Sequence, residues 1–171
     1  YSSAASDVYK RQVVSFATLT PYALVGLVFG VVAGVLASKF GYHRMLRVGI
    51  LVSLVGVLFG VYVAHSPSVW ALLVISVVLG VAYAGTANIM LNGLGIVLSP
   101  DDNPGYLPGL NAGAFNLGAG LSYAVLYAVM NAFAGSSGGT AGYSAAMIAS
   151  AVLLGLALLA SFVIPKLERA A

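Results

Sequence analysis

Long apolar stretches alternate with short polar segments along the chain. Five of these stretches approach or exceed the length of about 20 residues with which an α-helix crosses a bilayer. Turn-forming segments separate them, such as GSSGGTAG at residues 135–142. The predicted spans cover residues 21–38, 46–64, 69–98, 106–133 and 143–164. This pattern predicts an all-α, polytopic membrane protein with about five transmembrane helices.

The composition agrees with lipid as the solvent. Of the 171 residues, 61% are hydrophobic and only 6% are charged, whereas a soluble domain carries about 25% charged residues. There is no cysteine, which excludes disulfides and thiolate metal sites. The basic residues form no long stripe, so the modest positive charge does not indicate a nucleic-acid partner.

The few charges lie near the ends of the predicted helices and indicate their orientation. Basic residues flank the first joint, at 39–47, and follow the last span, at 166–169. Five alternating crossings put both places on one side of the membrane, which the positive-inside rule makes cytoplasmic. Asp101 and Asp102 fall in a joint on this side, where they can pair with the basic residues. We therefore expect a multi-pass protein of the cell membrane with a cytoplasmic C-terminus.

The first twenty residues fit this scheme poorly. Residues 2–12, SSAASDVYKRQ, resemble the in-frame translation of a transposase adaptor used for sequencing libraries, so we assign 1–12 to a non-native segment. Residues 13–20, VVSFATLT, are too short to span and indicate the end of a preceding helix or an outer loop. Pro21 suits the first position of a helix, because that position needs no backbone N–H. We therefore expect the native protein to continue upstream.

The first joint carries the most specific motif of the chain. It reads GVLASKFGYHRMLRVG over 34–49 and resembles the signature loop of the major facilitator superfamily. Ser38 stands where that family usually has an Asp, and Tyr42 stands where a basic residue is frequent. The residues that match or occupy the motif are Gly34, Ser38, Lys39, Gly41, His43 and Arg44. The family carries this loop twice, once in each half, and the second copy is the more degenerate. The departures at Ser38 and Tyr42 therefore favour the second copy, between the eighth and ninth of typically twelve helices.

A second stretch resembles drug-exporting members of the same superfamily. It reads PDDNPGYLPGLNAGAFNLGAGL over 100–121, and its matching residues are Gly105, Gly109, Leu110, Asn111, Gly118 and Gly120. The resemblance implies that residues 21–165 form most of the C-terminal six-helix bundle of a transporter, with a cytoplasmic tail at 166–171. It also implies alternating access, in which two halves rock around a central cavity and the signature loop locks one conformation. The missing N-terminal half of the same protein would then be a partner of this chain.

Small residues form two stripes that predict close helix packing. Gly26, Gly30 and Gly34 repeat every four residues and make a doubled GxxxG ridge. The partner of this ridge lies either in the missing half, which we favour, or within the chain. The second stripe, on one face of the span 106–133, consists of Ala114, Gly118 and Ser122. The second and fifth spans are nearly pure Val, Leu, Ala, Gly and Ile, which predicts that they face lipid.

Polar side chains within the spans predict a substrate cavity. A bare amide is costly in lipid, so such residues are expected to meet protein or water. Asn88 and Asn116 each lie ten residues from the inner end of their spans, which places both roughly 15 Å deep, near mid-membrane. Transporter sites lie at that depth, although Asn and Tyr also bond helices together. The candidates for lining the cavity are Tyr83, Asn88, Asn92, Asn116, Tyr123, Tyr127 and Asn131.

The sequence carries no motif of an enzyme or a metal site. It lacks HExxH, a Gly-rich phosphate loop and a nucleophile elbow, and His43 and His65 lie at opposite ends of a span. We therefore expect no catalysis, no metal and no cofactor. The predicted spans also lack Asp and Glu, and their few basic residues lie at the ends, so a proton-coupling residue would lie in the absent half.

These observations lead to one functional hypothesis with open alternatives. We expect a fragment of a secondary active transporter that exports a drug-like or small metabolite substrate as an antiporter with protons. The alternatives are a symporter of sugars or organic solutes from the same superfamily, and a membrane scaffold without transport. The lack of basic residues in the cavity-lining candidates weighs against anionic substrates.

Overall fold

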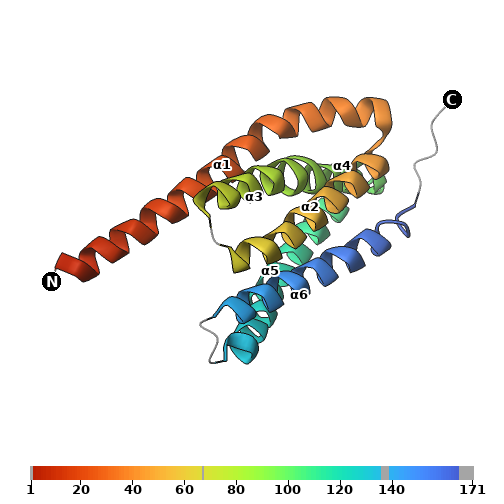
Figure 1. Ribbon diagram of the computed structural model, residues 1–171. Coiled ribbons are helices and arrows are strands. Elements are labelled where there is room, and N and C mark those ends of the chain that lie inside the picture. The colour runs from red at the N-terminus through yellow and green to blue at the C-terminus, as the bar shows by residue number, and fades with distance from the viewer. Residues whose placement is uncertain (1, 67, 136–138, 166–171) are drawn as a thin grey trace.

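Helices account for every regular element in the part of the chain that the structure describes. The computed structural model describes residues 2–66, 68–135 and 139–165, with side chains from residue 12 onward except at residue 17. The elements, in order, are α1 (Ser2–Phe40), α2 (Tyr42–His65), α3 (Val69–Leu79), η1 (Gly80–Ala87), α4 (Asn88–Leu98), α5 (Tyr106–Ala134) and α6 (Thr140–Ala160). Because α3, η1 and α4 are continuous, these elements form five rods that are long and apolar enough to cross a membrane (Figure 1). The prediction of an all-α protein with five spans is confirmed.

The first helix begins earlier than the sequence predicts. α1 is continuous from Ser2 to Phe40 and contains Pro21, so the predicted helix start at Pro21 is wrong. Transmembrane helices tolerate an internal proline, because neighbouring groups can satisfy the backbone carbonyl that it leaves free. The apolar part of the rod, Gln12–Phe40, includes residues 13–20, and the N-terminal end of α1 projects beyond the other helices (Figure 1). The division of the chain into segments of different origin remains a prediction.

α2 packs one face against the rest of the bundle and exposes the opposite face. It contacts α1, α3, η1, α4 and α6, and it has the largest buried share of the five spans. Its buried small residues are Gly49, Ser53, Gly56 and Gly60. A Cβ atom at Gly49 would come within 2.7 Å of the carbonyl oxygen of Ala82, so the backbones of α2 and η1 are in contact. The predicted lipid-facing role of the second span therefore fits only one of its faces, which exposes apolar side chains such as Val55 and Leu58. The small side chains of the other face allow close packing instead.

The third span changes its helical pitch in the middle. η1 is a π-helix, in which backbone hydrogen bonds reach back five residues and the turn is wider than in an α-helix. The hydroxyl of Thr86 donates to the carbonyl of Val81, five residues earlier, at 2.8 Å. In α3 the hydroxyl of Ser76 donates to the carbonyl of Thr18 and joins the span to α1. The first bond thus supports the wide turn from within, and the second ties the helix before it to α1.

The glycine ridge of α1 packs within the chain. A Cβ atom at Gly26 would lie 2.8 Å from the Cβ of Ala84, and one at Gly30 would lie 3.6 Å from the side chain of Ile89. Beside Gly34, in contrast, no atom of the described residues lies within 4 Å of that position. The prediction that the missing half covers this ridge is therefore wrong for Gly26 and Gly30. Their lack of a side chain lets η1 and α4 approach instead.

α5 lies at the edge of the bundle. It contacts α4 and α6, and none of its residues is buried. We predicted that the stripe of Ala114, Gly118 and Ser122 packs against another helix. A Cβ atom at Gly118 would meet nothing within 4 Å in the described structure, and the stripe borders an open cavity. No described helix packs at Gly118, so the packing of this stripe remains a prediction.

The start of α2 and the end of α6 meet at one end of the bundle. The guanidinium of Arg47 donates to the carbonyl of Ser161 at 3.3 Å and lies 4.1 Å from the centre of the Phe162 ring. The Nε2 atom of His43 donates to the carbonyl of Pro165 at 2.7 Å, since a carbonyl can only accept. The first joint and the end of the last span therefore share one side, as predicted. The basic residues of the tail lie outside the described ranges.

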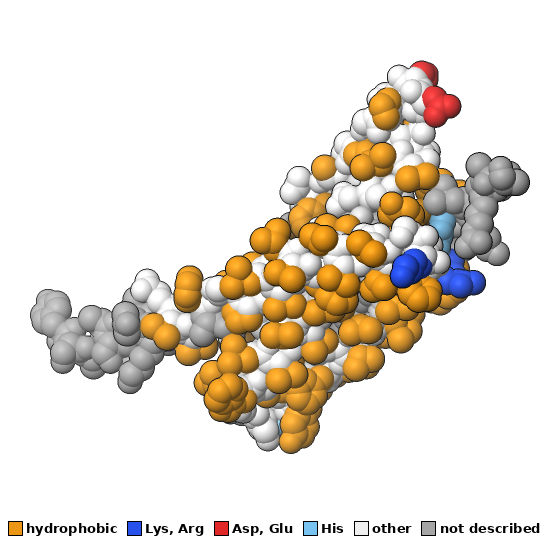
Figure 2. Space-filling view, turned by 90° about the horizontal axis from the view of Figure 1, so that it is seen from above, with side chains coloured by type: hydrophobic (Ala, Val, Ile, Leu, Met, Phe, Trp, Pro, Cys, Tyr) orange, Lys and Arg blue, Asp and Glu red, His pale blue; other side chains and the backbone are white. Residues whose placement is uncertain are grey.

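The acidic joint does not meet the basic one. Figure 2 shows the described acidic side chains at one tip of the molecule and the described Lys and Arg side chains at a separate place. Among the described residues, the expected pairing of Asp101 and Asp102 with the basic loop is therefore absent. Most of the remaining surface in this view is apolar, as contact with lipid requires.

Candidate substrate-binding site

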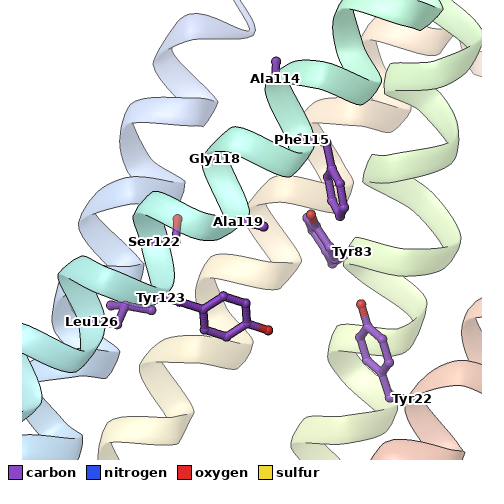
Figure 3. A pocket seen from close by; sticks show the side chains of 9 residues that line it. All are labelled: Tyr22, Tyr83, Ala114, Phe115, Gly118, Ala119, Ser122, Tyr123 and Leu126. Carbon is purple, nitrogen blue, oxygen red and sulfur yellow. The ribbon is translucent and has the colours of Figure 1, made fainter.

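An aromatic cavity lies between α5 and the middle of the third span (Figure 3). Its volume is about 510 Å³. Its aromatic members come from three elements, with Tyr22 in α1, Tyr83 in η1, and Phe115 and Tyr123 in α5. The other lining residues are Ala114, Gly118, Ala119, Ser122 and Leu126. We refer to this space as the aromatic cavity.

The rings around the aromatic cavity face one another. In Figure 3 the ring of Phe115 lies beside that of Tyr83, and the ring of Tyr123 points from α5 towards the side that carries Tyr22 and Tyr83. Tyr83 belongs to the π-helix, so the wide turn determines where its ring lies. Rings of this kind can stack on a flat ligand, and the tyrosine hydroxyls can bond to its polar edge.

A second cavity adjoins the first and is lined by amides. Its volume is about 230 Å³. The residues that line it belong to α4 and α5 and are Asn88, Asn92, Asn111, Ala112, Phe115 and Asn116. Phe115 lines both cavities, so the two spaces are neighbours. We refer to the second one as the amide cavity.

Three of the four amides form a hydrogen-bonded chain. Asn92 donates from Nδ2 to the backbone carbonyl of Asn88 at 2.9 Å and to the Oδ1 atom of Asn88 at 3.3 Å. Asn111 donates from Nδ2 to the Oδ1 atom of Asn92 at 2.8 Å, which joins α5 to α4. Asn116 lines the cavity and has no hydrogen-bond partner among the described residues. The cavity thus combines amides of fixed orientation with one that is free to rotate.

The structure brings most of the predicted candidates together. Those that line the two cavities are Tyr83, Asn88, Asn92, Asn116 and Tyr123. Asn88 and Asn116 share one cavity, as their equal predicted depth requires. Tyr127 and Asn131 lie farther along α5 and line neither cavity. The role of these residues in binding a substrate remains a prediction.

Among the aromatic and amide residues that line the cavities, three were not predicted candidates, namely Tyr22, Asn111 and Phe115. Asn111 carried a signal, because it lies five residues after the start of α5 while Asn92 lies six residues before the end of α4. The depth argument that joins Asn88 and Asn116 therefore also joins this pair. No comparable signal in the sequence singled out Tyr22 or Phe115, because aromatic residues are common on both lipid-facing and buried surfaces.

The residues of the signature loop line neither cavity. Gly41 has a φ of +87°, a conformation that side chains disfavour, so the predicted tight turn is present. The hydroxyl of Ser38, which replaces the usual Asp, donates to the carbonyl of Val35 in its own helix at 2.7 Å. Lys39 and Arg44 are exposed. The role of this loop as a conformational lock remains a prediction.

The polar groups of the two cavities are uncharged at neutral pH. No Asp, Glu, Lys, Arg or His is among the residues that line them. Within the described ranges, no group of three His, Cys, Asp or Glu residues is placed to hold a metal ion. The site can therefore offer stacking surfaces and neutral hydrogen bonds, which suit a neutral ligand with a flat ring.

A bundle of five helices that are long and apolar enough to span a membrane, with polar cavities between them, is typical of multi-pass membrane transporters. The chain belongs to the Major Facilitator Superfamily, whose family model matches residues 6–171, and the predicted resemblance is confirmed. Over 113 residues the chain is 62% identical to the uridine/deoxyuridine transporter of Lactococcus lactis subsp. cremoris. That alignment covers 66% of this chain and 24% of the relative, so the chain spans about a quarter of its length. No solved structure matches the chain.

Proposed function

We propose that this chain forms one wall of the substrate pathway of a secondary transporter for pyrimidine nucleosides. The observation that carries the proposal is the amide cavity, where four asparagines meet beside the ring of Phe115. A pyrimidine base is flat and has carbonyl and N–H groups along one edge. Amides can bond to such an edge, while an aromatic ring can stack on the face of the base.

The neighbouring aromatic cavity extends the same chemistry. Tyr22, Tyr83 and Tyr123 bring phenolic hydroxyls to it, and these groups can both donate to and accept from the hydroxyls of a sugar. Because neither cavity is lined by a charged residue, a neutral nucleoside fits this wall better than a nucleotide, whose phosphate would need cationic partners.

The similarity to a known transporter supports a nucleoside over a drug-like substrate. The relative from Lactococcus lactis is named for uridine and deoxyuridine, and it shares 62% of the aligned residues. A similarity at this level favours a related substrate, and we therefore take a nucleoside, in place of the drug-like molecule, as the first candidate.

Transport by alternating access needs a second wall, which this chain does not supply. We propose that upstream residues of the same protein provide it, and that Phe40 and Arg47 lie at the cytoplasmic side of the cell membrane with the C-terminus. Coupling to protons would require a titratable group in the pathway. Since no Asp, Glu, Lys, Arg or His lines either cavity, we place such a group in the second wall.

Proton-coupled export of a drug-like substrate is the second candidate function. The observation that favours it is the aromatic cavity, because rings from three helices can accommodate a large apolar molecule. The export direction and the coupling to protons are parts of this candidate.

The experiment that separates the two candidates uses the complete gene, including the sequence upstream of this chain. It would be expressed in a bacterial host that lacks uridine uptake, and the entry of radiolabelled uridine would be measured. The nucleoside proposal expects saturable uptake that unlabelled uridine inhibits. Absence of uridine uptake, together with proton-dependent resistance to a hydrophobic drug, would reject that proposal in favour of export. A protonophore added during uptake then tests the coupling ion.

A further inference from the structure

The chain of amides in the amide cavity has a defined polarity. The backbone carbonyl of Asn88 can only accept, so the group of Asn92 that faces it must be Nδ2. The Oδ1 atom of Asn92 therefore faces Asn111, which must donate from its own Nδ2. The Nδ2 atom of Asn92 also faces the side chain of Asn88, whose nearer atom must then be Oδ1. A single backbone carbonyl thus determines the orientation of all three side-chain amides.

This polarity leaves different atoms available at the two ends of the chain of amides. At Asn88 the Nδ2 atom keeps two N–H donors that no described residue accepts, and at Asn111 the Oδ1 atom keeps its lone pairs. Both residues line the amide cavity, as does the ring of Phe115. The cavity therefore offers a donor and an acceptor in a set order beside a stacking surface.

We propose that these three amides read the base and select uracil over cytosine. The proposal rests on the transport of pyrimidine nucleosides proposed above. Uracil has a carbonyl oxygen at position 4 next to N3–H, whereas cytosine has an amino group next to an unprotonated N3. With the sugar holding the base in one pose, O4 of uracil accepts from Asn88 and N3–H donates to Asn111. Cytosine in this pose places donor against donor and acceptor against acceptor.

A freely rotating amide could not make this distinction. Rotation by 180° about the last side-chain torsion exchanges the oxygen and nitrogen of an asparagine, so a free amide suits either base. Asn116 is such an amide, since no described residue fixes its orientation. The selectivity therefore belongs to Asn88 and Asn111, which the bond network holds, and Asn116 contributes to affinity for both bases. A site that leaves polar groups unpaired rejects the wrong ligand strongly.

The first test uses the unaltered, complete transporter. Uptake of radiolabelled uridine would be inhibited with unlabelled uridine, cytidine or 3-methyluridine, the last of which lacks N3–H. We expect cytidine and 3-methyluridine to inhibit at least about tenfold more weakly than uridine. Equal inhibition by all three would overturn this inference and leave nucleoside transport intact. A protein that takes up no uridine would overturn both.

The second test changes the donor at one end of the chain of amides. Asn88→Asp keeps the shape of the side chain and replaces N–H donors with an acceptor. We expect the KM for uridine to rise about tenfold or more and the uridine-to-cytidine preference to shift towards cytidine. Asn116→Asp should weaken uptake of both nucleosides alike, and Asn103→Asp, in the exposed joint before α5, should change neither.

The controls separate a specific effect from a general one. Membrane abundance of each variant would be measured by immunoblot. If Asn88→Asp lowers uptake of uridine and cytidine equally at normal abundance, the proposal is overturned, because the amide then only holds the helices together. If Asn88→Asp fails to reach the membrane, the inhibition series with the unaltered protein decides the question.

Discussion

The guanidinium of Arg47 lies 4.1 Å from the centre of the Phe162 ring and donates to the carbonyl of Ser161. The carbonyls at the C-terminal end of a helix lack donors within the helix, and a cation there also interacts favourably with the helix dipole. Arg47 thus fastens the end of α6 to the start of α2, a helix that also contacts α1, α3, η1 and α4.

Substitution of Arg47 is therefore expected to destabilise the transporter. Arg47→Ala removes the stacking interaction and the hydrogen bond, and it should lower the free energy of unfolding by about 1–3 kcal/mol. Arg47→Lys should recover only part of this loss, because an ammonium group cannot stack as a planar guanidinium does. The measurement is the thermal midpoint of the purified, complete protein in detergent. Arg44→Ala, at an exposed neighbour, is the control, and an equal effect of the two alanine variants would contradict the prediction.

Close backbone contact between α2 and η1 makes Gly49 sensitive to any side chain. A Cβ atom there would lie 2.7 Å from the carbonyl oxygen of Ala82 and 2.8 Å from the backbone nitrogen of Ala87. Backbone atoms cannot rotate away, so Gly49→Ala should cost about 1–3 kcal/mol of stability. Gly155→Ala in α6 has open space around it and should be neutral or slightly stabilising, because alanine favours helix. Thermal midpoints of both variants check this, and a stable Gly49→Ala protein would show that the helices separate easily.

The side chain of Thr86 supports the π-helical turn that carries Tyr83. Its hydroxyl donates to the carbonyl of Val81 at 2.8 Å, and the residue is buried. Thr86→Val keeps the shape but removes this donor, which should cost about 1–2 kcal/mol and raise the KM for uridine. Thr86→Ser keeps the hydroxyl and should restore most of the activity. An unchanged KM in Thr86→Val would mean that the wide turn does not depend on this bond.

The sequence predicted the number and type of the spans, because each apolar stretch has to be long enough to cross lipid. It failed at Pro21, where a rule for water-soluble helices was applied to a helix that tolerates proline in a membrane. It also missed that one face of α2 is packed against other helices. The spacing of Gly49, Ser53, Gly56 and Gly60 was visible, but the high content of Val and Leu in the same segment indicated lipid contact.

The candidate site was predictable in part for a similar reason. Depth along a helix follows from counting residues, and it placed Asn88 and Asn116 together. The direction in which a face points depends on the neighbouring helices, so counting could not show that Tyr127 and Asn131 line neither cavity. The π-helix has no simple sequence signal. Gly80 and Gly85 within it lie against the backbone of α1, and such a contact depends on how the helices pack.

Tyr83 distinguishes between the two candidate functions. Its hydroxyl and its ring both belong to the aromatic cavity, beside the ring of Phe115 (Figure 3). If sugar hydroxyls bond to the phenol, Tyr83→Phe should raise the KM for uridine by about five- to tenfold, which corresponds to the loss of one hydrogen bond. Tyr83→Ala should reduce uptake further, because it also removes the stacking surface.

A hydrophobic drug would respond differently to the same two variants. It needs the ring and not the hydroxyl, so Tyr83→Phe should leave drug resistance unchanged while Tyr83→Ala lowers it. Tyr143→Phe, on the exposed surface of α6 and outside both cavities, serves as the control for loss of a phenol. Uridine uptake and drug resistance measured on the three variants at equal membrane abundance therefore assign the aromatic cavity to one substrate. An unaltered uridine KM in Tyr83→Phe would remove the sugar from this cavity and favour the apolar ligand.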